Sequence, residues 1–260
     1  MDPAILVLAG RRSAAADPLA ARAGVSHKAM VPVGGEAMVG RVLRIAEQAF
    51  PRAPLYVSVD DPAALASEPT VARLSAAGTV TIVAAEPNIV DSVVAASAAA
   101  GFPLLITTAD NVLMTPEGIR AIHAMGEAGG ADAIAMFAER SDILAAHPDG
   151  QRRFYAFRGG AYSNCNLFWL GSDRALRAAD SFRLGGQFAK HKRRAVKALG
   201  LTTLFLYASR LLTLEGMFRH FSRRFGVAIR PLVTAHGRLA IDVDNERTFR
   251  VAEELLARRA

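Results

Sequence analysis

The chain has 260 residues, a hydrophobic content of 52%, six histidines and a formal net charge of +7. This length and composition predict a single folded domain over residues 1–260 and exclude a mostly disordered chain. The single cysteine, Cys165, excludes an intramolecular disulfide and favours a reducing, cytoplasmic location. The histidines are too scattered for a zinc site, and no apolar run reaches the roughly 18 to 20 residues that span a membrane.

Short apolar runs alternate with helical patterns along the chain. Strands are predicted at residues 4–9, 55–59, 80–84, 104–108, 133–137, 166–170, 228–233 and 239–242. Helices are predicted at residues 37–48, 71–77, 91–100, 116–127 and 246–257. This alternation predicts an α/β fold, with a mostly parallel sheet covered by helices on both faces.

A basic loop and a glycine pair follow the first predicted strand. Arg11 and Arg12 come directly after Gly10, and Lys28 opens the run Lys-Ala-Met-Val-Pro-Val-Gly-Gly. Glycine lets a backbone approach a phosphate closely, and basic side chains supply charge against a triphosphate. The pattern therefore predicts a nucleotide site, and the alternative is an ordinary strand-turn-helix unit with a solvated lysine.

Acidic side chains end two of the predicted strands. Asp110 follows the apolar run Leu-Leu-Ile-Thr-Thr-Ala, and Asp242 and Asp244 end the run Leu-Ala-Ile-Asp-Val-Asp. In a parallel sheet Asp60, Asp110 and the arginine loop should share the carboxyl edge, where ligands bind. Carboxylates at this edge suit Mg²⁺. We assign Asp110 and Asp242 to the metal and Asp244 mainly to capping the last helix. The roles of Asp242 and Asp244 could be exchanged.

Four motifs in this order resemble the MobA-like nucleotidyltransferases, which have a Rossmann-like GT-A fold, a three-layer sandwich. They are Leu-Ala-Gly near the start, His27-Lys28-Ala-Met-Val-Pro-Val-Gly-Gly-Glu-Ala-Met, Thr-Thr-Ala-Asp110, and Ile-Asp-Val-Asp near the end. The resemblance covers residues 4 to about 175 and 228–257. It implies that an NTP is joined to a phosphorylated acceptor and that pyrophosphate leaves.

The resemblance also implies roles for individual residues. Lys28 and Arg12 would contact phosphate as catalytic groups together with Asp110, and Asp110 and Asp242 would bind Mg²⁺. Ser92 would face the nucleoside, and Asn164 would contact the acceptor. The nucleotide-binding loop would comprise Leu8, Ala9, Gly10, Arg11 and Arg12.

The phosphate loop departs from the family pattern, because arginines follow Gly10 where further glycines are usual. Guanidinium groups bind phosphate well, so we expect Arg11 and Arg12 to replace backbone donors; the alternative is a loosely held triphosphate and weak catalysis. Two other functions stay open. One is a GT-A glycosyltransferase that uses a nucleotide-sugar, although the Asp-x-Asp lies at 242–244 rather than mid-chain. The other is a non-catalytic nucleotide-binding or membrane-associated module.

Positive charge is concentrated in one segment. Residues 183–230 hold eleven Lys or Arg residues and one acid, Glu215. No nucleic-acid recognition motif accompanies this charge, so we expect no nucleic-acid partner. We treat residues 183–226 as an added basic helical segment. It contains an amphipathic helix that Thr213 and Gly226 can cap.

The apolar face of this amphipathic helix carries Leu214, Met217, Phe218, Phe221 and Phe225. Such a helix could lie on an anionic membrane, and the acceptor would then be a lipid-precursor phosphate rather than a soluble small molecule. The alternative is that the aromatic stripe packs on the sheet or in a homodimer interface.

Overall fold

The structure is a computed structural model, and it describes residues 2–11, 17–177 and 192–258. Its strands are β1 (Ala4–Leu8), β2 (Pro32–Val33), β3 (Glu36–Ala37), β4 (Leu55–Val59), β5 (Val80–Ala84), β6 (Leu104–Thr108), β7 (Ala133–Glu139), β8 (Tyr155–Phe157), β9 (Gly160–Leu170) and β10 (Ile229–Thr234). Its α-helices are α1 (Pro18–Ala23), α2 (Met38–Ala49), α3 (Pro69–Ala76), α4 (Ile89–Ala100), α5 (Pro116–Glu127), α6 (Arg140–Ala146), α8 (Lys192–Ala208), α9 (Leu214–Phe225) and α10 (Glu246–Ala257). Short 3₁₀ helices are η1 (Lys28–Met30), η2 (Pro62–Leu65), η3 (Asp173–Ala175) and η4 (Gly237–Ala240).

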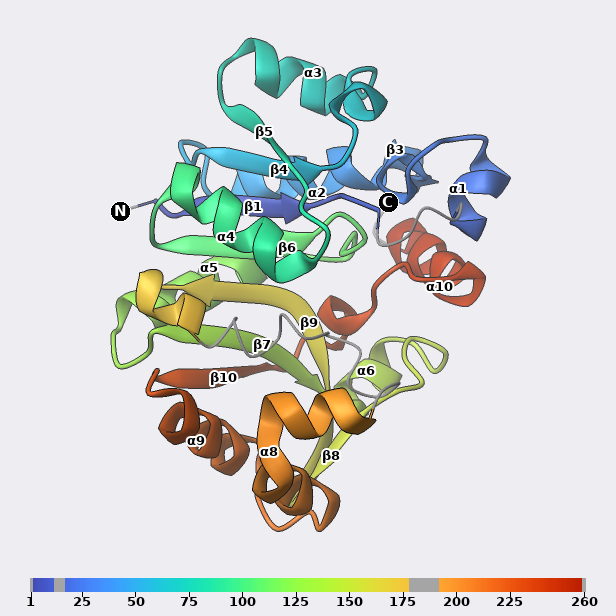
Figure 1. The fold of residues 1–260 in the computed structure, drawn as a ribbon. Helices are drawn as coiled ribbons and strands as arrows, with labels where there is room; N and C mark the ends of the chain where they lie inside the picture. Colours follow the sequence, from blue (N-terminus) through green and yellow to red (C-terminus); the bar gives the residue numbers. More distant parts are fainter. Residues whose placement is uncertain (1, 12–16, 178–191, 259–260) are drawn as a thin grey trace.

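Among the described residues, eight strands form one sheet in the order β10-β7-β9-β6-β1-β4-β5, with β8 paired to β9 (Figure 1). The pairs β1–β4, β1–β6, β4–β5 and β10–β7 are parallel. Of the strands that the structure describes, β9 and its hairpin partner β8 make the sheet mixed, because β9 runs antiparallel to both β6 and β7. The predicted mostly parallel α/β fold is therefore confirmed.

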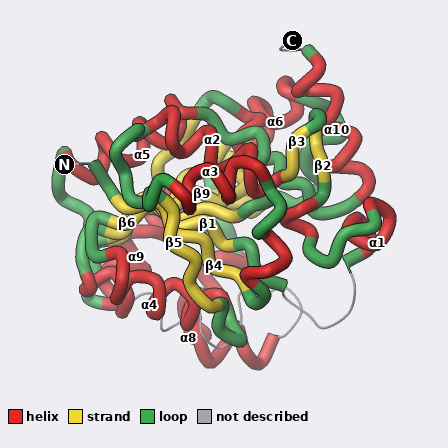
Figure 2. Tube along the Cα trace, turned by 90° about the horizontal axis from the view of Figure 1, so that it is seen from above, coloured by secondary structure: helices red, strands yellow, loops and turns green. Residues whose placement is uncertain are grey.

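Helices cover both faces of the sheet, as predicted (Figure 2). Alternate residues of β1 belong to the cores on these two faces. Ile5 and Val7 belong to the large core that α2, α5 and α10 complete. Ala4 and Leu6 point the other way and pack with Val93 of α4. This alternation follows from the two-residue period of a strand, and it explains why β1 is apolar throughout.

The predicted strand at 239–242 is wrong. These residues instead form the end of η4 and an irregular stretch after it, while β10 forms the sheet edge. Leu239 and Ile241 are buried as part of the large core, so their apolar character serves packing against the end of the sheet rather than strand pairing. The backbone N–H of Val243 donates to the carbonyl of Asp110 at 3.0 Å, which fastens this stretch beside the end of β6.

Several short elements were not predicted from the sequence, among them β2, β3 and β8. The strand predicted at 166–170 begins at Gly160, because it forms a hairpin with β8, and helices α1 and α6 were not predicted. Both helices are short, with six and seven residues, so they present too little periodicity to be recognised. Asp17 nevertheless caps α1 by accepting from the backbone N–H groups of Leu19 and Ala20.

The amphipathic helix of the basic segment is present as α9, with Thr213 and Gly226 as its caps. Its stripe packs on the sheet: Leu214 and Phe218 are buried, and the Phe218 ring meets Phe137 of β7 edge to face at 5.6 Å between centroids. Residues 183–191 of the basic segment lie outside the described residues. Within the described parts of the chain, no helix combines the length and apolar character needed to cross a bilayer.

The packing of α5 on β9 gives a stability prediction. A Cβ at Gly126 would overlap the indole ring of Trp169, whereas a Cβ at Gly118 in the same helix would lie 3.0 Å from Leu239 Cδ1, which can move. We expect Gly126→Ala to lower the free energy of unfolding by about 1–3 kcal/mol, the usual cost of overpacking. Gly118→Ala should be neutral or stabilising by up to ~1 kcal/mol, because alanine favours the helix.

Urea unfolding of both variants measures this difference. Equal unfolding free energies for Gly126→Ala and wild type would contradict the packing of Trp169 against α5.

Candidate functional site

The ends of β1, β4 and β6 form the edge where the predicted site residues gather. The backbone N–H of Ala9 donates to Ser58 at 2.8 Å, and that of Ala109 donates to Leu8 at 3.0 Å, so the three strands end side by side. A Cβ at Gly10 would lie 2.9 Å from Ala85 Cβ, so only glycine fits this close approach. Gly10 thus lies at one edge with Asp110, as predicted from the parallel sheet, and Leu8 and Ala9 lead into this edge.

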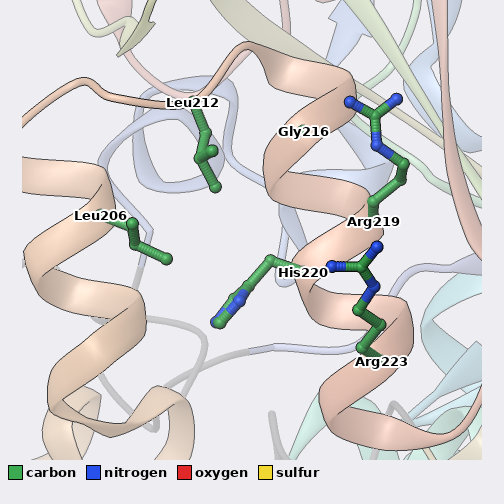
Figure 3. Close-up of a pocket in the computed structure, with 6 residues that line it drawn as sticks. All are labelled: Leu206, Leu212, Gly216, Arg219, His220 and Arg223. Carbon is green, nitrogen blue, oxygen red and sulfur yellow. The ribbon is translucent and has the colours of Figure 1, made fainter.

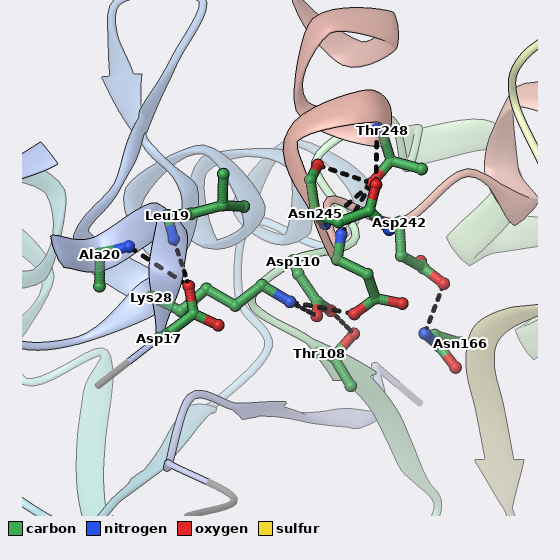
Figure 4. A network of polar contacts seen from close by, with 11 residues as sticks. Asp17, Leu19, Ala20, Lys28, Thr108, Asp110, Asn166, Asp242, Asn245 and Thr248 are labelled. Carbon is green, nitrogen blue, oxygen red and sulfur yellow. Dashed lines mark hydrogen bonds and ion pairs between the residues drawn. The ribbon is translucent and has the colours of Figure 1, made fainter. Parts of the chain in front are cut away.

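Lys28 connects two acidic residues that are far apart in sequence. Its Nζ lies 2.6 Å from Asp110 Oδ2 and 3.1 Å from Asp244 Oδ1 (Figure 4). Burial by itself would lower the pKa of Lys28, but Asp110 and Asp244 outweigh burial and hold the pKa above its ordinary value. The ammonium group is therefore a fixed positive charge at this edge of the sheet.

Asp110 is held in place from two sides. Thr108 Oγ1 donates to Asp110 Oδ1 at 2.5 Å, and Lys28 binds the other carboxylate oxygen. Asp110 is buried apart from a small exposed fraction, and its backbone carbonyl accepts from Val243. This last bond brings Asp242 and Asp244 to the same edge as Asp110.

Asp242 is buried next to these groups. Burial, followed by the charges of Asp110 and Asp244, raises the pKa of Asp242 well above its ordinary value. Asn166 Nδ2 donates to Asp242 Oδ2 at 2.7 Å, whereas Oδ1 is buried without a hydrogen-bond partner in the described structure. A buried carboxylate oxygen without a partner costs free energy, so a cation beside it would be stabilising.

Asn166 was not predicted as a site residue. It has a φ of 46°, in the left-handed region, at an irregularity where β9 shifts register against β7. Asn164 Oδ1, the predicted acceptor contact, accepts from the backbone N–H of Asn166 at 2.9 Å. A non-glycine residue in this conformation is strained and persists where the surroundings hold it. The run Asn-Cys-Asn is the sequence signal, since asparagine tolerates this conformation best.

The predicted capping role of Asp244 is wrong. The N-cap of α10 is Asn245, whose side chain and Thr248 form a reciprocal capping box. Asp244 instead directs its carboxylate to Lys28, while its backbone N–H donates to Thr248 Oγ1 at 2.9 Å. The capping box therefore sets the position of the Asp244 backbone.

A second polar group lies at the end of β4. Arg11 donates to Asp60 through its backbone N–H at 3.0 Å and through Nε at 2.7 Å. His27, which is almost fully buried, places Nε2 3.3 Å from Asp60 Oδ1. Burial would raise the pKa of Asp60, but the hydrogen bonds from Arg11 outweigh burial and lower it to about 2. Asp60 thus stays ionised and fixes the start of the arginine loop.

Of the two remaining predicted residues, the structure describes Ser92 alone. Arg12 lies outside the described residues. Ser92 is buried, and its hydroxyl accepts from the backbone N–H of Glu86 at 2.9 Å and donates to the carbonyl of Asn88 at 3.2 Å. These bonds close the loop between β5 and α4.

The carboxylates at this edge are the type of side chain that binds a hard divalent cation. Within the residues that the structure describes, no group of three or more His, Cys, Asp or Glu side chains forms a complete metal-binding set. Mg²⁺ commonly takes one or two protein carboxylates and completes its shell with water and substrate phosphates. Asp110 and the unpartnered Oδ1 of Asp242 fit this kind of incomplete site.

Comparisons with solved structures agree with this fold. A hypothetical transferase from Thermus thermophilus has a TM-score of 0.77 at 23% identity, over 96% of this chain and 100% of the other. A CMP:2-keto-3-deoxy-manno-octonic acid synthetase complexed with CTP has a TM-score of 0.62 at 12% identity, over 100% of both chains. Bifunctional IspDF from Campylobacter jejuni has a TM-score of 0.56 at 9% identity, over 96% of this chain and 54% of the other.

At such low identity these likenesses establish the fold. The sequence matches no curated protein at a significant level. Residues 5–199, which are most of the chain, match the MobA-like NTP transferase domain, so this chain belongs to the MobA-like NTP transferase family of nucleotidyltransferases.

Proposed function

We propose that this protein transfers the NMP part of an NTP to a phosphorylated acceptor in an Mg²⁺-dependent reaction that releases pyrophosphate. The observation that carries this proposal is the Lys28 ammonium group, held between Asp110 and Asp244 at the end of the central strands. In an open α/β sheet this edge is where ligands bind, and the charges present suit a metal-bound triphosphate.

The reaction requires little covalent chemistry from the protein. An oxygen of the acceptor phosphate attacks the α-phosphorus of the NTP and forms a new phosphoanhydride bond. The bond between the α-phosphorus and the bridging oxygen breaks, and its electron pair leaves with pyrophosphate. Because the attacking oxygen is already anionic, no general base is needed, and catalysis depends on positioning and charge neutralisation.

Asp110 and Asp242 are the residues that would hold Mg²⁺. When bound, the ion neutralises phosphate charge and helps to align the α-phosphate with the acceptor. Asp242 is kept in place by Asn166, and Asp110 by Thr108, so both carboxylates are positioned before the substrate arrives.

Lys28 and the arginine loop supply the remaining positive charge. The Lys28 ammonium group stabilises the charge that builds on the leaving pyrophosphate. In this structure it contacts Asp110 and Asp244, so a bound triphosphate would compete with these carboxylates for it. Arg11 is oriented by Asp60, and Arg12 follows it in the loop where glycines are usual.

We assign the nucleotide only as an NTP and the acceptor only as a phosphorylated compound. Ser92 supports the loop that we propose faces the nucleoside. Asn164, which accepts from the backbone of Asn166, is the residue that we propose contacts the acceptor. The free thiol Cys165 is buried, which suits a reducing, cytoplasmic environment. A phosphorylated small molecule and a lipid-precursor phosphate both satisfy the chemistry.

The direct test incubates the protein with each of the four NTPs, Mg²⁺ and a panel of phosphorylated acceptors, and measures pyrophosphate. We expect pyrophosphate release that depends on one class of acceptor. Release of a nucleoside diphosphate from a nucleotide-sugar would support a GT-A glycosyltransferase instead. NTP binding without any turnover across the panel would favour a non-catalytic nucleotide-binding module.

Substitution of the carboxylates tests the metal assignment. Asp110→Asn and Asp242→Asn should each lower kcat by about 10²–10³-fold or more. Each change weakens the binding of Mg²⁺, which would neutralise the negative charge of the transition state. Asp244→Asn should have a smaller effect. Asp173→Asn is the matched control, because Asp173 is exposed on η3 after β9 and outside the site. A wild-type rate for Asp110→Asn, measured by pyrophosphate release, would show that the assignment is wrong.

The basic residues should act on nucleotide binding. We expect Lys28→Ala and Arg12→Ala each to raise the Kd of the NTP by about tenfold, because each removes a charge from the phosphates. Arg52→Ala is the control, since Arg52 is 91% exposed and distant from this edge. Calorimetric titration measures the three Kd values. Unchanged affinity in both site variants would show that neither side chain binds the phosphates.

Asp60 should affect NTP binding through its contact with Arg11. Arg11→Ala and Asp60→Asn should each weaken NTP binding several-fold, and the double variant should be no weaker than the more affected single variant. Additive losses in this double-mutant cycle, measured as Kd values, would mean that Asp60 does not orient Arg11 toward the nucleotide.

A further inference from the structure

The second half of α8 exposes large apolar side chains. Leu201 and Phe205, one helical turn apart, are 73% and 66% exposed, and Leu211, just after the helix, is 51% exposed. Large apolar side chains grouped on one surface element mark a binding surface more often than isolated ones do. These three residues form the apolar part of what we call the α8–α9 surface.

Polar side chains of α9, two of them arginines, form the other part of this surface. Arg219, His220 and Arg223 line a hollow of about 360 Å³ together with Leu206, Leu212 and Gly216 (Figure 3). Leu206 from α8 and His220 from α9 point toward each other across this hollow. The lining therefore combines two exposed arginines with aliphatic groups, which is the chemistry that an amphiphile with a phosphate headgroup requires.

A third arginine lies close to the exposed leucine. Gly200 has a φ of 76° and breaks the regular path of α8, and Arg224 Nη1 lies 2.9 Å from where a Cβ would stand at Gly200. The Arg224 guanidinium thus sits at the kink directly before Leu201. From residue 200 to 230 the chain carries five arginines and a single acid, Glu215.

The α8–α9 surface is anchored to the sheet, so its exposed residues are not needed for the core. Thr203 Oγ1 and His220 Nε2 are 2.8 Å apart, and the backbone N–H of Arg158 donates to Leu212 at 2.9 Å. The ring of Tyr207 packs against Phe157 of β8 with 5.7 Å between centroids. Together with the buried stripe of α9, these contacts hold the apolar residues outward on a fixed base.

We infer that the α8–α9 surface binds the face of an anionic phospholipid bilayer. Leu201, Phe205 and Leu211 enter the boundary between headgroups and acyl chains, and Arg219, Arg223 and Arg224 bind headgroup phosphates. This places the apolar contact on α8 rather than on the aromatic stripe of α9, which the sheet covers. The inference is independent of the proposed nucleotidyl transfer, because it uses none of the site residues.

Charge favours a bilayer over a second copy of the chain. A two-fold dimer brings the same patch together from both subunits, so the arginines of one copy would face those of the other. A phosphate-bearing surface has the opposite charge and no such repulsion. The exposed aliphatic and phenyl groups of the patch also suit acyl chains better than the phosphates of a nucleic acid.

Vesicle co-sedimentation of the full chain tests this inference. We expect binding to vesicles of phosphatidylcholine with phosphatidylglycerol, little binding to phosphatidylcholine alone, and a clear loss of binding at high salt. Leu201→Ser with Phe205→Ser, and Arg219→Glu with Arg223→Glu, should each lower the partition coefficient by about tenfold or more.

Matched controls separate the surface from bulk charge and hydrophobicity. Arg52→Glu with Arg258→Glu changes the net charge equally on exposed residues elsewhere, and Ile89→Ser removes an exposed apolar side chain from α4. Both controls should bind anionic vesicles as wild type does. All altered side chains are exposed, so thermal unfolding should be unchanged in every variant.

Three outcomes would overturn the inference. The first is no salt-sensitive binding to anionic vesicles. The second is equal loss of binding in the charge control and in the arginine pair, which would mean non-specific attraction. The third is that the double variant Leu201→Ser with Phe205→Ser still binds vesicles but no longer forms a dimer that the wild type forms in sedimentation velocity. Loss of tight RNA binding in this variant, again with vesicle binding retained, would count in the same way.

Discussion

The site depends on the neutralisation of several carboxylates that the fold brings together. Asp110, Asp242 and Asp244 repel one another, and the Lys28 ammonium group lies against two of them. Partly buried like charges are costly unless a counter-charge lies close to them. The loop that contains Lys28, the end of β6 and the turn before α10 are therefore linked by electrostatics as well as by packing.

The backbone brings these three segments into reach. Parallel pairing of β1 with β6 ends both strands at one edge, and the bond from Val243 to the Asp110 carbonyl carries the C-terminal turn to the same place. The Asn245–Thr248 capping box then sets where Asp244 lies. The nucleotide site that we propose is this fixed array of charges, at the edge where an α/β sheet opens to ligands.

Periodicity was sufficient to predict most of the sheet. The strands at 55–59, 80–84 and 104–108 and the last helix have the predicted bounds, since each combines a clear apolar run with a capping or turn residue. The stretch 239–242 has the same local pattern as a strand but buries its apolar residues at the end of the sheet. Likewise, the contact of Asp244 with Lys28 depends on segments 216 residues apart, so no local pattern could reveal it.

In the proposed site, the carboxylates and a divalent ion together hold the triphosphate. The most direct measurement is calorimetric titration of NTP into the protein with Mg²⁺ and again with EDTA. We expect tight binding with Mg²⁺, a Kd at least about tenfold higher with EDTA, and loss of this difference in Asp242→Asn. The same Kd with and without Mg²⁺ in the wild-type protein would contradict the claim.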